Sequence, residues 1–296
     1  MKSGFVSIIG RPNVGKSTLL NAILGEKIAI TADKPQTTRN RIRGIYSEPE
    51  PDACQLVFID TPGIARPRNK LGAYMTDQAM STFGEVDIIL FVVDEKLGDR
   101  GGDNFIAGRL SGTDTPKILV INKMDTMTPD EYKSIFDEYE RTGVFAEIFG
   151  ISALKGDNVP LLVETLKGYA EDGPAYFPAG MVTDMPERFL AGEIIREKML
   201  HYLRDEVPHG VAVELESYEE KPNLTKISAV IYTEKKSHKG IIIGKDGHTL
   251  KGIGKSARTE IEALLGVRVF LELWVKVKEN WRDSDRLLSS LGYRGD

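Results

Sequence analysis

Gly10-Arg11-Pro12-Asn13-Val14-Gly15-Lys16-Ser17, near the start of the chain, fits the pattern G-x-x-x-x-G-K-[ST]. The apolar segment Phe5–Ile9 before it predicts a strand, and a helical pattern follows it. Glycines let main-chain N–H groups approach phosphate oxygens, and the start of a helix adds partial positive charge. An ordinary strand–turn–helix loop is the alternative, but this context favours a phosphate-binding loop. Lys16 would then contact the β- and γ-phosphates, and Ser17 would bind Mg²⁺.

A second motif, Asp60-Thr61-Pro62-Gly63, directly follows the apolar segment Gln55–Ile59. An aspartate at the carboxyl end of a strand can hold Mg²⁺ through a water molecule. Gly63 has no side chain, so its main-chain N–H can approach a γ-phosphate. The four residues also suit an ordinary turn. Their position downstream of the phosphate-binding loop favours the nucleotide site.

A third motif, Asn122-Lys123-Met124-Asp125, follows another predicted strand. Guanine presents two hydrogen-bond donors on one edge, which the Asp125 carboxylate can accept, whereas adenine would leave it unpaired. Asn122 would tie the loop to the base, and the stem of Lys123 would cover the ring. Ser152-Ala153-Leu154 follows the next strand and can offer an N–H to the guanine oxygen. Alone, the third motif also suits a helix cap or turn, but the ordered series predicts binding of GTP and GDP.

Residues 1–172 alternate short apolar segments with amphipathic stretches. This alternation predicts an α/β fold with a mixed, mostly parallel sheet and helices on both faces. The alternating segment Arg41–Tyr46 would supply the one antiparallel pair, with Gln55–Ile59. The other predicted strands are Phe5–Ile9, Val86–Val93 and Lys117–Ile121, and predicted helices span 69–83 and 129–141.

Two prolines and two glycines within 171–180 predict a linker. We therefore expect a first domain at 1–172, a linker at 173–183 and a second domain at 184–296. The second domain has a different predicted order of helix, two strands, two helices and strand. Its predicted elements are a helix at 186–202, strands at 211–215 and 224–232, a glycine-interrupted helical region at 240–266, a strand at 267–277 and a terminal helix at 280–291.

The loop Gly244-Lys245-Asp246-Gly247 fits the G-x-x-G pattern that lets a nucleic-acid backbone come close in KH domains. It lies in a basic stripe from Lys235 to Arg258, which has seven Lys or Arg and one acid, a net charge of +6. Such a stripe in an acidic protein is typical of a local nucleic-acid site. The alternative is a small α/β protein-interaction domain with a solvated lysine face. The candidate RNA-binding residues are Lys239, Gly240, Ile243, Gly244, Lys245, Asp246, Gly247, Lys251, Lys255 and Arg258.

The motifs GRPNVGKS, DTPG, NKMD and SAL, in this order, resemble the translation-factor-related branch of the P-loop GTPases. With one C-terminal KH domain, essentially the whole chain resembles the bacterial Era family. The likeness extends to segments 186–191 and 193–197. It implies a GTPase that binds single-stranded RNA near the 3′ end of small-subunit rRNA and assists assembly of the small ribosomal subunit. It also implies a monomer in the cytoplasm, loosely associated with the inner face of the cell membrane.

The segment Gln36-Thr37-Thr38-Arg39 fits the first switch of that branch. The family pattern favours Thr38 as the Mg²⁺ ligand that senses the γ-phosphate, with Thr37 as the fallback; a flexible polar loop is the alternative. The resemblance thus gives Lys16, Thr38 and Gly63 as catalytic residues, and Ser17, Thr38 and, through water, Asp60 as Mg²⁺ ligands. Expected nucleotide contacts are Gly10, Arg11, Pro12, Asn13, Val14, Gly15, Lys16, Ser17, Thr18, Asp60, Thr61, Pro62, Gly63, Asn122, Lys123, Asp125, Ser152, Ala153 and Leu154.

Ile64 stands where many GTPases place a glutamine that orients the attacking water. An aliphatic side chain forms no hydrogen bond, so unaided hydrolysis should be slow. Arg66 and Arg68 are nearby but are weaker catalytic candidates, because they lie in a segment expected to be mobile. Asn13 resembles a position that coordinates K⁺ in some relatives, and a K⁺ there would neutralise charge as an arginine finger does.

The composition excludes several other classes. The chain has 296 residues, 41% hydrophobic and 28% charged, which is typical of a globular protein of about two domains. Its net charge of −5 argues against a protein that coats nucleic acid uniformly. The longest apolar run, Val86–Val93, is shorter than the about 20 residues of a transmembrane helix. Cys54 is the single cysteine and has no intrachain disulfide partner.

Two other functions are compatible with a GTPase domain. One is a signalling switch whose C-terminal domain binds protein, which the basic stripe and the G-x-x-G loop disfavour. The other is a GTPase that serves RNA modification or membrane transport. No second catalytic constellation and no spanning segment in the sequence supports it.

Overall fold

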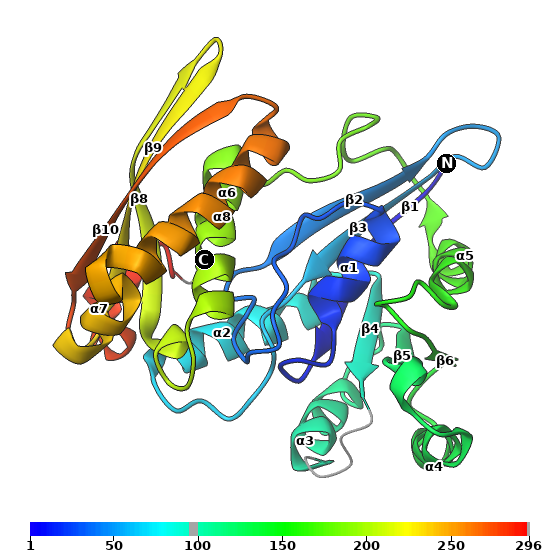
Figure 1. Cartoon of the computed structure of the whole chain (residues 1–296). Coiled ribbons are helices and arrows are strands. Elements are labelled where there is room, and N and C mark those ends of the chain that lie inside the picture. Colours follow the sequence, from blue (N-terminus) through cyan, green and yellow to red (C-terminus); the bar gives the residue numbers. More distant parts are fainter. Residues whose placement is uncertain (95–99, 295–296) are drawn as a thin grey trace. The chain divides into compact units, whose positions relative to one another are not determined.

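The computed structural model describes residues 1–94 and 100–294, which form two compact units (Figure 1). Each unit gathers segments from different parts of the sequence. The first unit comprises Met1–Thr31, Thr38–Arg68 and Gly72–Asp184, and the second comprises Ala32–Thr37, Asn69–Leu71 and Met185–Asp296.

The first unit is built on a seven-stranded sheet with the order β2-β3-β1-β4-β5-β6 and with β7 beside β1. Pairing is parallel except between β2 and β3, which confirms that predicted antiparallel pair, and between β7 and β1, a second antiparallel pair that the sequence does not predict. The strands are β1 (Lys2–Gly10), β2 (Ile42–Glu48), β3 (Cys54–Asp60), β4 (Ile88–Val93), β5 (Lys117–Ile121), β6 (Glu147–Gly150) and β7 (Glu171–Asp172).

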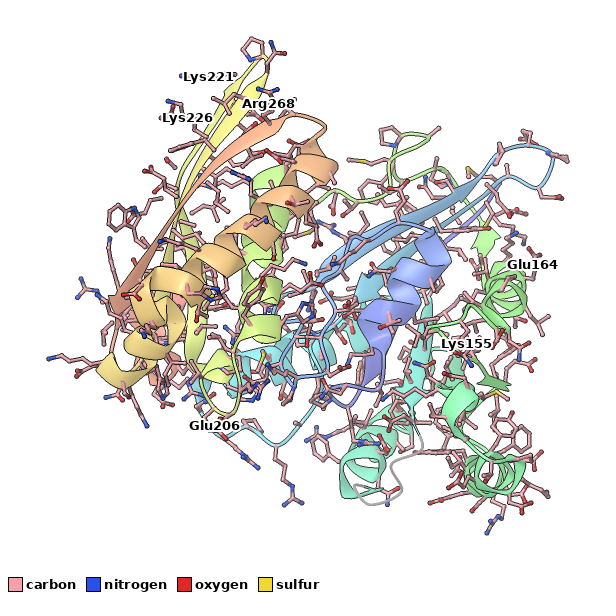
Figure 2. All side chains as sticks on the ribbon, in the orientation of Figure 1. Lys155, Glu164, Glu206, Lys221, Lys226 and Arg268 are labelled. Atoms are coloured by element: carbon pink, nitrogen blue, oxygen red, sulfur yellow. The ribbon has the colours of Figure 1, made fainter. Side chains whose placement is uncertain are left out.

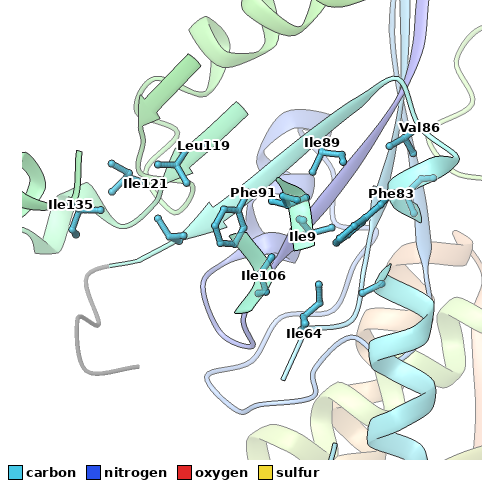
Figure 3. Packing of buried hydrophobic residues seen from close by; sticks show 14 residues of the cluster. Ile9, Ile64, Phe83, Val86, Ile89, Phe91, Ile106, Leu119, Ile121 and Ile135 are labelled. Carbon is cyan, nitrogen blue, oxygen red and sulfur yellow. The ribbon is translucent and has the colours of Figure 1, made fainter. Parts of the chain in front are cut away.

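Helices cover both faces of this sheet, as predicted. All six residues of β4 are buried, and successive side chains of a strand point to opposite faces. On one face, apolar side chains of α2, α3 and α4 pack against β4 and β5 (Figure 3). α1 contacts β1, β2, β3 and α5. The helices are α1 (Lys16–Leu24), α2 (Lys70–Ser81), α3 (Arg100–Leu110), α4 (Pro129–Glu140) and α5 (Val159–Tyr169).

The segment predicted as a linker, 173–183, is irregular and belongs to the first unit, where hydrogen bonds join it to β2 and β3. The Gln55 side chain donates to the carbonyl of Phe177 at 3.0 Å and accepts from two main-chain N–H groups of the segment. The Ile45 N–H donates to the carbonyl of Val182 at 2.8 Å. The segment therefore satisfies polar groups of β2 and β3 that would otherwise face solvent.

The second unit contains a three-stranded sheet with the order β10-β9-β8. β8 and β9 are antiparallel, and β9 and β10 are parallel. Apolar residues of α6 and α8 pack on one face of this sheet and form the core of the unit. Its elements are α6 (Glu187–Tyr202), β8 (Val211–Lys221), β9 (Leu224–Thr233), α7 (Lys236–Ile243), α8 (His248–Leu265), β10 (Arg268–Val277) and α9 (Asp285–Ser290).

The predicted terminal helix, 280–291, is longer than the one the structure forms. Asn280 adopts a left-handed conformation with φ of 52°, which is incompatible with a continuing helix. Trp281 is fully buried, and its indole N–H donates to the carbonyl of Gly210 at 3.0 Å. α9 begins only after Ser284, whose side chain accepts from the Leu287 N–H. Among the helices of the described residues, none is long and apolar enough to cross a membrane.

Candidate nucleotide and RNA sites

The phosphate-binding loop connects the carboxyl end of β1 to the start of α1, as the sequence predicts. Gly15 has φ of 96°, and a Cβ added there would lie 2.2 Å from Nδ2 of Asn122, so only glycine fits. The ammonium of Lys16 donates to the carbonyls of Gly10 at 3.3 Å and Arg11 at 2.9 Å. Burial lowers the pKa of Lys16 to about 8. An ammonium inside this loop can exchange these carbonyls for phosphate oxygens.

Three oxygen-bearing side chains converge beside the loop. The Ser17 hydroxyl donates to Oδ2 of Asp60 at 2.7 Å, and the Thr38 hydroxyl lies 3.2 Å from the same oxygen and 2.8 Å from Ser17 Oγ. Asp60 is fully buried, and this burial raises the pKa of its carboxyl group. Thr37 instead donates to the carbonyl of Lys34 at 2.6 Å. The structure therefore brings Thr38, and not Thr37, to Ser17 and Asp60.

These oxygens fit a Mg²⁺ ion. Oδ1 of Asp60 is buried and has no hydrogen-bond partner among the described residues. A buried carboxylate oxygen without a partner is costly and is satisfied by a cation or by its water ligand. Hydroxyl and carboxylate oxygens are ligands of the kind that Mg²⁺ prefers, and Mg²⁺ usually retains several water molecules.

The guanine motif lies beside the phosphate-binding loop at the ends of β5 and β6. The Asn122 side chain donates to the carbonyl of Val14 at 2.9 Å and accepts from the Ala153 N–H at 2.9 Å. The Ser152 hydroxyl donates to Oδ1 of Asp125 at 2.7 Å and orients that carboxylate. Four segments predicted separately from the sequence thus meet at the carboxyl ends of neighbouring strands, where open α/β sheets bind ligands.

Ile64 belongs to the hydrophobic core and is only 2% exposed (Figure 3). It packs in the same cluster as Ile106 of α3, and its N–H donates to the carbonyl of Gly10 at 3.0 Å. The main chain after the second motif therefore adjoins the phosphate-binding loop, while the side chain points into the core. Arg66 and Arg68 are exposed.

The second unit has the element order that the sequence predicts for a KH domain, and its G-x-x-G loop lies between α7 and α8. Gly244 has φ of 73° and ψ of 174°, and an added Cβ would lie 2.3 Å from Thr249 Oγ1. Only glycine is compatible with this backbone. Gly247 is left-handed with φ of 75°, but an added Cβ would meet nothing closer than 3.7 Å. Lys245 is exposed between them.

α8 presents three basic residues on one exposed face, because Lys251, Lys255 and Arg258 are four and three residues apart. Lys239 and Ile243 of α7 are half-buried, and Ile243 packs against the core. Ile241, two residues before Ile243 in the same isoleucine run, is 51% exposed, which the sequence pattern does not predict. Figure 2 also shows basic side chains near the β8–β9 turn and the start of β10, namely Lys221, Lys226 and Arg268.

Family models match both halves of the chain. A model described as a 50S ribosome-binding GTPase matches residues 5–123, and a model described as a KH domain matches residues 206–282. The protein GTPase Era of Alkaliphilus oremlandii is 58% identical over 294 residues, which cover 99% of each chain. GTPase Era of Clostridioides difficile is 56% identical over 295 residues, covering 99% of this chain and 98% of that protein.

Two solved structures superpose on the complete chain, each with a TM-score of 0.95 and with 100% of both chains covered. One is a variant of Era from Aquifex aeolicus bound to GDP·AlF₄⁻, which is 41% identical. The other, 42% identical, is an Era protein in complex with MgGDPNP and nucleotides 1506–1542 of 16S ribosomal RNA.

Proposed function

Because this chain belongs to the Era family of GTPases, we propose that it couples GTP binding and hydrolysis to the binding of ribosomal RNA by its KH domain. GTP occupies the carboxyl edge of the first sheet, where the phosphate-binding, metal and guanine motifs meet. RNA occupies the G-x-x-G loop and the basic face of α8. The observation that carries the nucleotide part is the convergence of Ser17, Thr38 and Asp60.

In this site Ser17, Thr38 and, through water, Asp60 would hold Mg²⁺, which would supply positive charge to the β- and γ-phosphate oxygens. The Lys16 ammonium leaves the carbonyls of Gly10 and Arg11 for those oxygens. Main-chain N–H groups of the loop cradle the phosphates. The Gly63 N–H approaches the γ-phosphate, because this stretch of main chain lies against the phosphate-binding loop.

Guanine selectivity comes from Asp125, which accepts the two donors of the guanine edge and is oriented by Ser152. Asn122 joins this loop to the phosphate-binding loop. The Ala153 N–H donates to the Asn122 side chain in this structure and would turn from that acceptor to the guanine oxygen when the base binds. Adenine would leave the Asp125 carboxylate unpaired, and such a loss discriminates strongly.

Intrinsic hydrolysis is slow, because the buried Ile64 side chain neither orients nor deprotonates a water molecule. Charge compensation by K⁺ at Asn13 supports turnover in this scheme. Turnover should then be faster in KCl than in NaCl, and an Asn13→Ala variant should lose that difference. Equal rates of the parent protein in the two salts would remove K⁺ from the mechanism without affecting the Mg²⁺ site.

The RNA partner is the single-stranded 3′ region of small-subunit rRNA, and binding it assists assembly of that ribosomal subunit. Two independent observations support this. An Era protein that superposes on the complete chain binds nucleotides 1506–1542 of 16S rRNA. The exposed Lys245 lies in the loop, and the exposed Lys251, Lys255 and Arg258 follow it along α8, where they can meet RNA phosphates. The family resemblance also leads us to propose a cytoplasmic monomer with loose membrane contact, which gel filtration and cell fractionation test.

The decisive experiment is crosslinking of the full chain in the GTP- and GDP-bound states, followed by sequencing of the attached RNA. Reads should concentrate in the 3′ region of small-subunit rRNA, with a yield that depends on the nucleotide. A crosslinked protein and no RNA would instead identify a signalling switch. Equal RNA yields in both states would separate RNA binding from the nucleotide cycle.

A further inference from the structure

A network of four charged side chains, joined by ion pairs, lies beside the nucleotide motifs. Nε of Arg11 donates to Oδ1 of Asp103 at 2.7 Å, and its Nη2 donates to Oδ1 of Asp94 at 3.0 Å. The other Asp94 oxygen accepts from the Lys123 ammonium at 2.7 Å. The side chains of Arg11, Asp94 and Asp103 are at most 8% exposed, whereas that of Lys123 is 33% exposed.

The sheet topology explains why Asp94 lies in the middle of this ion-pair network. Arg11 follows β1, Asp94 follows β4 and Lys123 lies just beyond β5, and these strands are neighbours in the order β1-β4-β5. Because the carboxyl ends of parallel strands meet at one edge, the Asp94 carboxylate lies between the phosphate-binding loop and the guanine motif. Asp103, the fourth member of the network, lies on α3.

Lys123 is held at two points. Its ammonium donates to the carbonyl of Asn13 at 2.8 Å as well as to Asp94. Its main chain is left-handed with φ of 66°. With the two ends of the side chain fixed, the methylene stem between them has little freedom. A stem that is fixed before nucleotide arrives gives up less conformational entropy when it packs against a base.

We propose that Asp94 is a positioning residue for guanine-nucleotide binding, which anchors the Lys123 ammonium so that the Lys123 stem stays against the base and slows nucleotide release. The inference rests on the proposed guanine site. Asp94 touches neither base nor phosphate in this arrangement and acts through Lys123. It thereby ties the guanine motif to the phosphate-binding loop at a second point, besides the bond from Asn122 to Val14.

The charge balance of the network predicts which of its ion pairs is lost first when Asp94 is neutralised. Among the described residues, the ion pairs of this network join two acids and two bases, so an Asp94→Asn change removes one of the two carboxylates that face Arg11 and Lys123. An unbalanced buried charge moves to water where it can. Lys123 is partly exposed and has a flexible stem, whereas Arg11 is buried and still bonded to Asp103. The Lys123 end should therefore open.

The test measures GDP release from full-length protein with a fluorescent GDP analogue, for Asp94→Asn, Lys123→Met and the double variant. Lys123→Met keeps an apolar stem without the charge. Asp94→Asn should accelerate release on the order of tenfold or more, as loss of a buried charge partner acts mainly on dissociation. The double variant should release GDP no faster than Lys123→Met alone, because Asp94 has nothing left to position.

Asp103→Asn is the matched control. It removes the same charge from the same ion-pair network, but at the end away from Lys123. It should accelerate release less, and its effect should be the same with Lys123 or Met at position 123. If Asp94→Asn and Lys123→Met act additively on release, or if Asp103→Asn matches Asp94→Asn, Asp94 is merely a structural residue and the inference is wrong. A parent protein that fails to bind GDP would instead overturn the proposed function.

Discussion

The side-chain amide of Asn122 donates to the main-chain carbonyl of Val14 across 2.9 Å and so joins the guanine motif to the phosphate-binding loop. The same side chain accepts from the Ala153 N–H, and it is only 2% exposed. One side chain thus connects three segments that are far apart in the sequence. We therefore expect the guanine motif and the phosphate-binding loop to act together, so that a change at Asn122 affects both.

We expect Asn122→Ala to lower the affinities for GTP and GDP by similar factors and to lower the melting temperature as well. The carbonyl of Val14 and the N–H of Ala153 would lose their partner, and an unsatisfied buried polar group costs about 1–3 kcal/mol. Isothermal titration with both nucleotides and thermal unfolding measure the two effects. Asn104→Ala, at an exposed asparagine of α3, is the control and should change neither. A loss of GTP affinity with unchanged GDP affinity and melting temperature would contradict the role of Asn122 in joining the two motifs.

Asp125→Asn should weaken GTP binding and improve binding of xanthosine triphosphate. Xanthine carries an acceptor where guanine carries its amino donor, so an amide suits it better than a carboxylate does. The Ser152 hydroxyl, 2.7 Å from Oδ1 of Asp125, can still orient the amide. Competition of both nucleotides against labelled GDP measures the change. The assignment fails if the parent protein binds ATP as well as GTP, or if the variant keeps the parent preference.

Nucleotide affinity should fall as the pH rises above about 8. Burial lowers the pKa of Lys16 to about 8 from its ordinary 10.5 in the nucleotide-free protein, and phosphates require the ammonium. The stability of the nucleotide-free fold should change with pH in the opposite direction. Since the unfolded chain holds this proton up to the higher pKa, the contribution of Lys16 to the unfolding free energy increases between about 8 and 10.5.

Titration of GDP affinity from about pH 7 to about pH 9, with thermal unfolding of the nucleotide-free protein in the same buffers, tests both signs. Lys133→Met, at an exposed lysine of α4, should keep the parent trend. GDP affinity that stays constant across this range would show that Lys16 remains protonated in the free site.

The sequence predicts which segments meet at the candidate nucleotide site, because its motifs follow strands and parallel strands end at one edge. The family resemblance favours Thr38 over Thr37, and the structure adds the reason, since Thr38 meets Ser17 and Asp60. Asp94 directly follows a predicted apolar strand, but no motif in the sequence marks it. Its partners Arg11 and Lys123 are distant in the sequence, and only the strand order brings them together.

Local composition says less where tertiary contacts decide. The prolines and glycines of segment 173–183 predict a linker, and the structure adds that its main chain is hydrogen-bonded to Gln55 and Ile45. The pattern in 280–291 predicts one helix, but burial of Trp281 interrupts it. Neither result follows from propensity, because each depends on a partner more than 60 residues away in the sequence.

Ile64→Ala should destabilise the fold and leave the chemical step nearly intact. Ile64 is 2% exposed within the core cluster, so the truncation leaves a cavity that costs about 2–5 kcal/mol, whereas Ile64→Val costs about 0.5–1.5 kcal/mol. Single-turnover hydrolysis well below the melting temperature should be close to parent in both variants. A folded Ile64→Val protein that binds GTP but no longer hydrolyses it would show that Ile64 is more than a core residue.

Substitutions at the two glycines of the G-x-x-G loop should have different effects on the fold. Any side chain at Gly244 would collide with Thr249 and would damage the fold. Gly247 has open space for a Cβ, and its left-handed backbone is one that aspartate tolerates better than most residues. Gly247→Asp therefore adds bulk and negative charge to the loop at a modest cost in stability, which makes it the better test of RNA contact.

Gly247→Asp should weaken binding of single-stranded rRNA far more than it lowers the melting temperature, because RNA backbone would meet the added carboxylate. Lys245→Ala should cost less and should flatten the slope of log affinity against log salt by about 0.7, the value for one phosphate contact. Filter binding across a salt series, with circular dichroism for folding, measures both. Lys226→Ala on β9 removes an exposed lysine outside the basic stripe and should leave the slope unchanged. If folded Gly247→Asp protein binds the RNA like the parent, the loop is not the RNA clamp, and the KH domain binds its partner elsewhere.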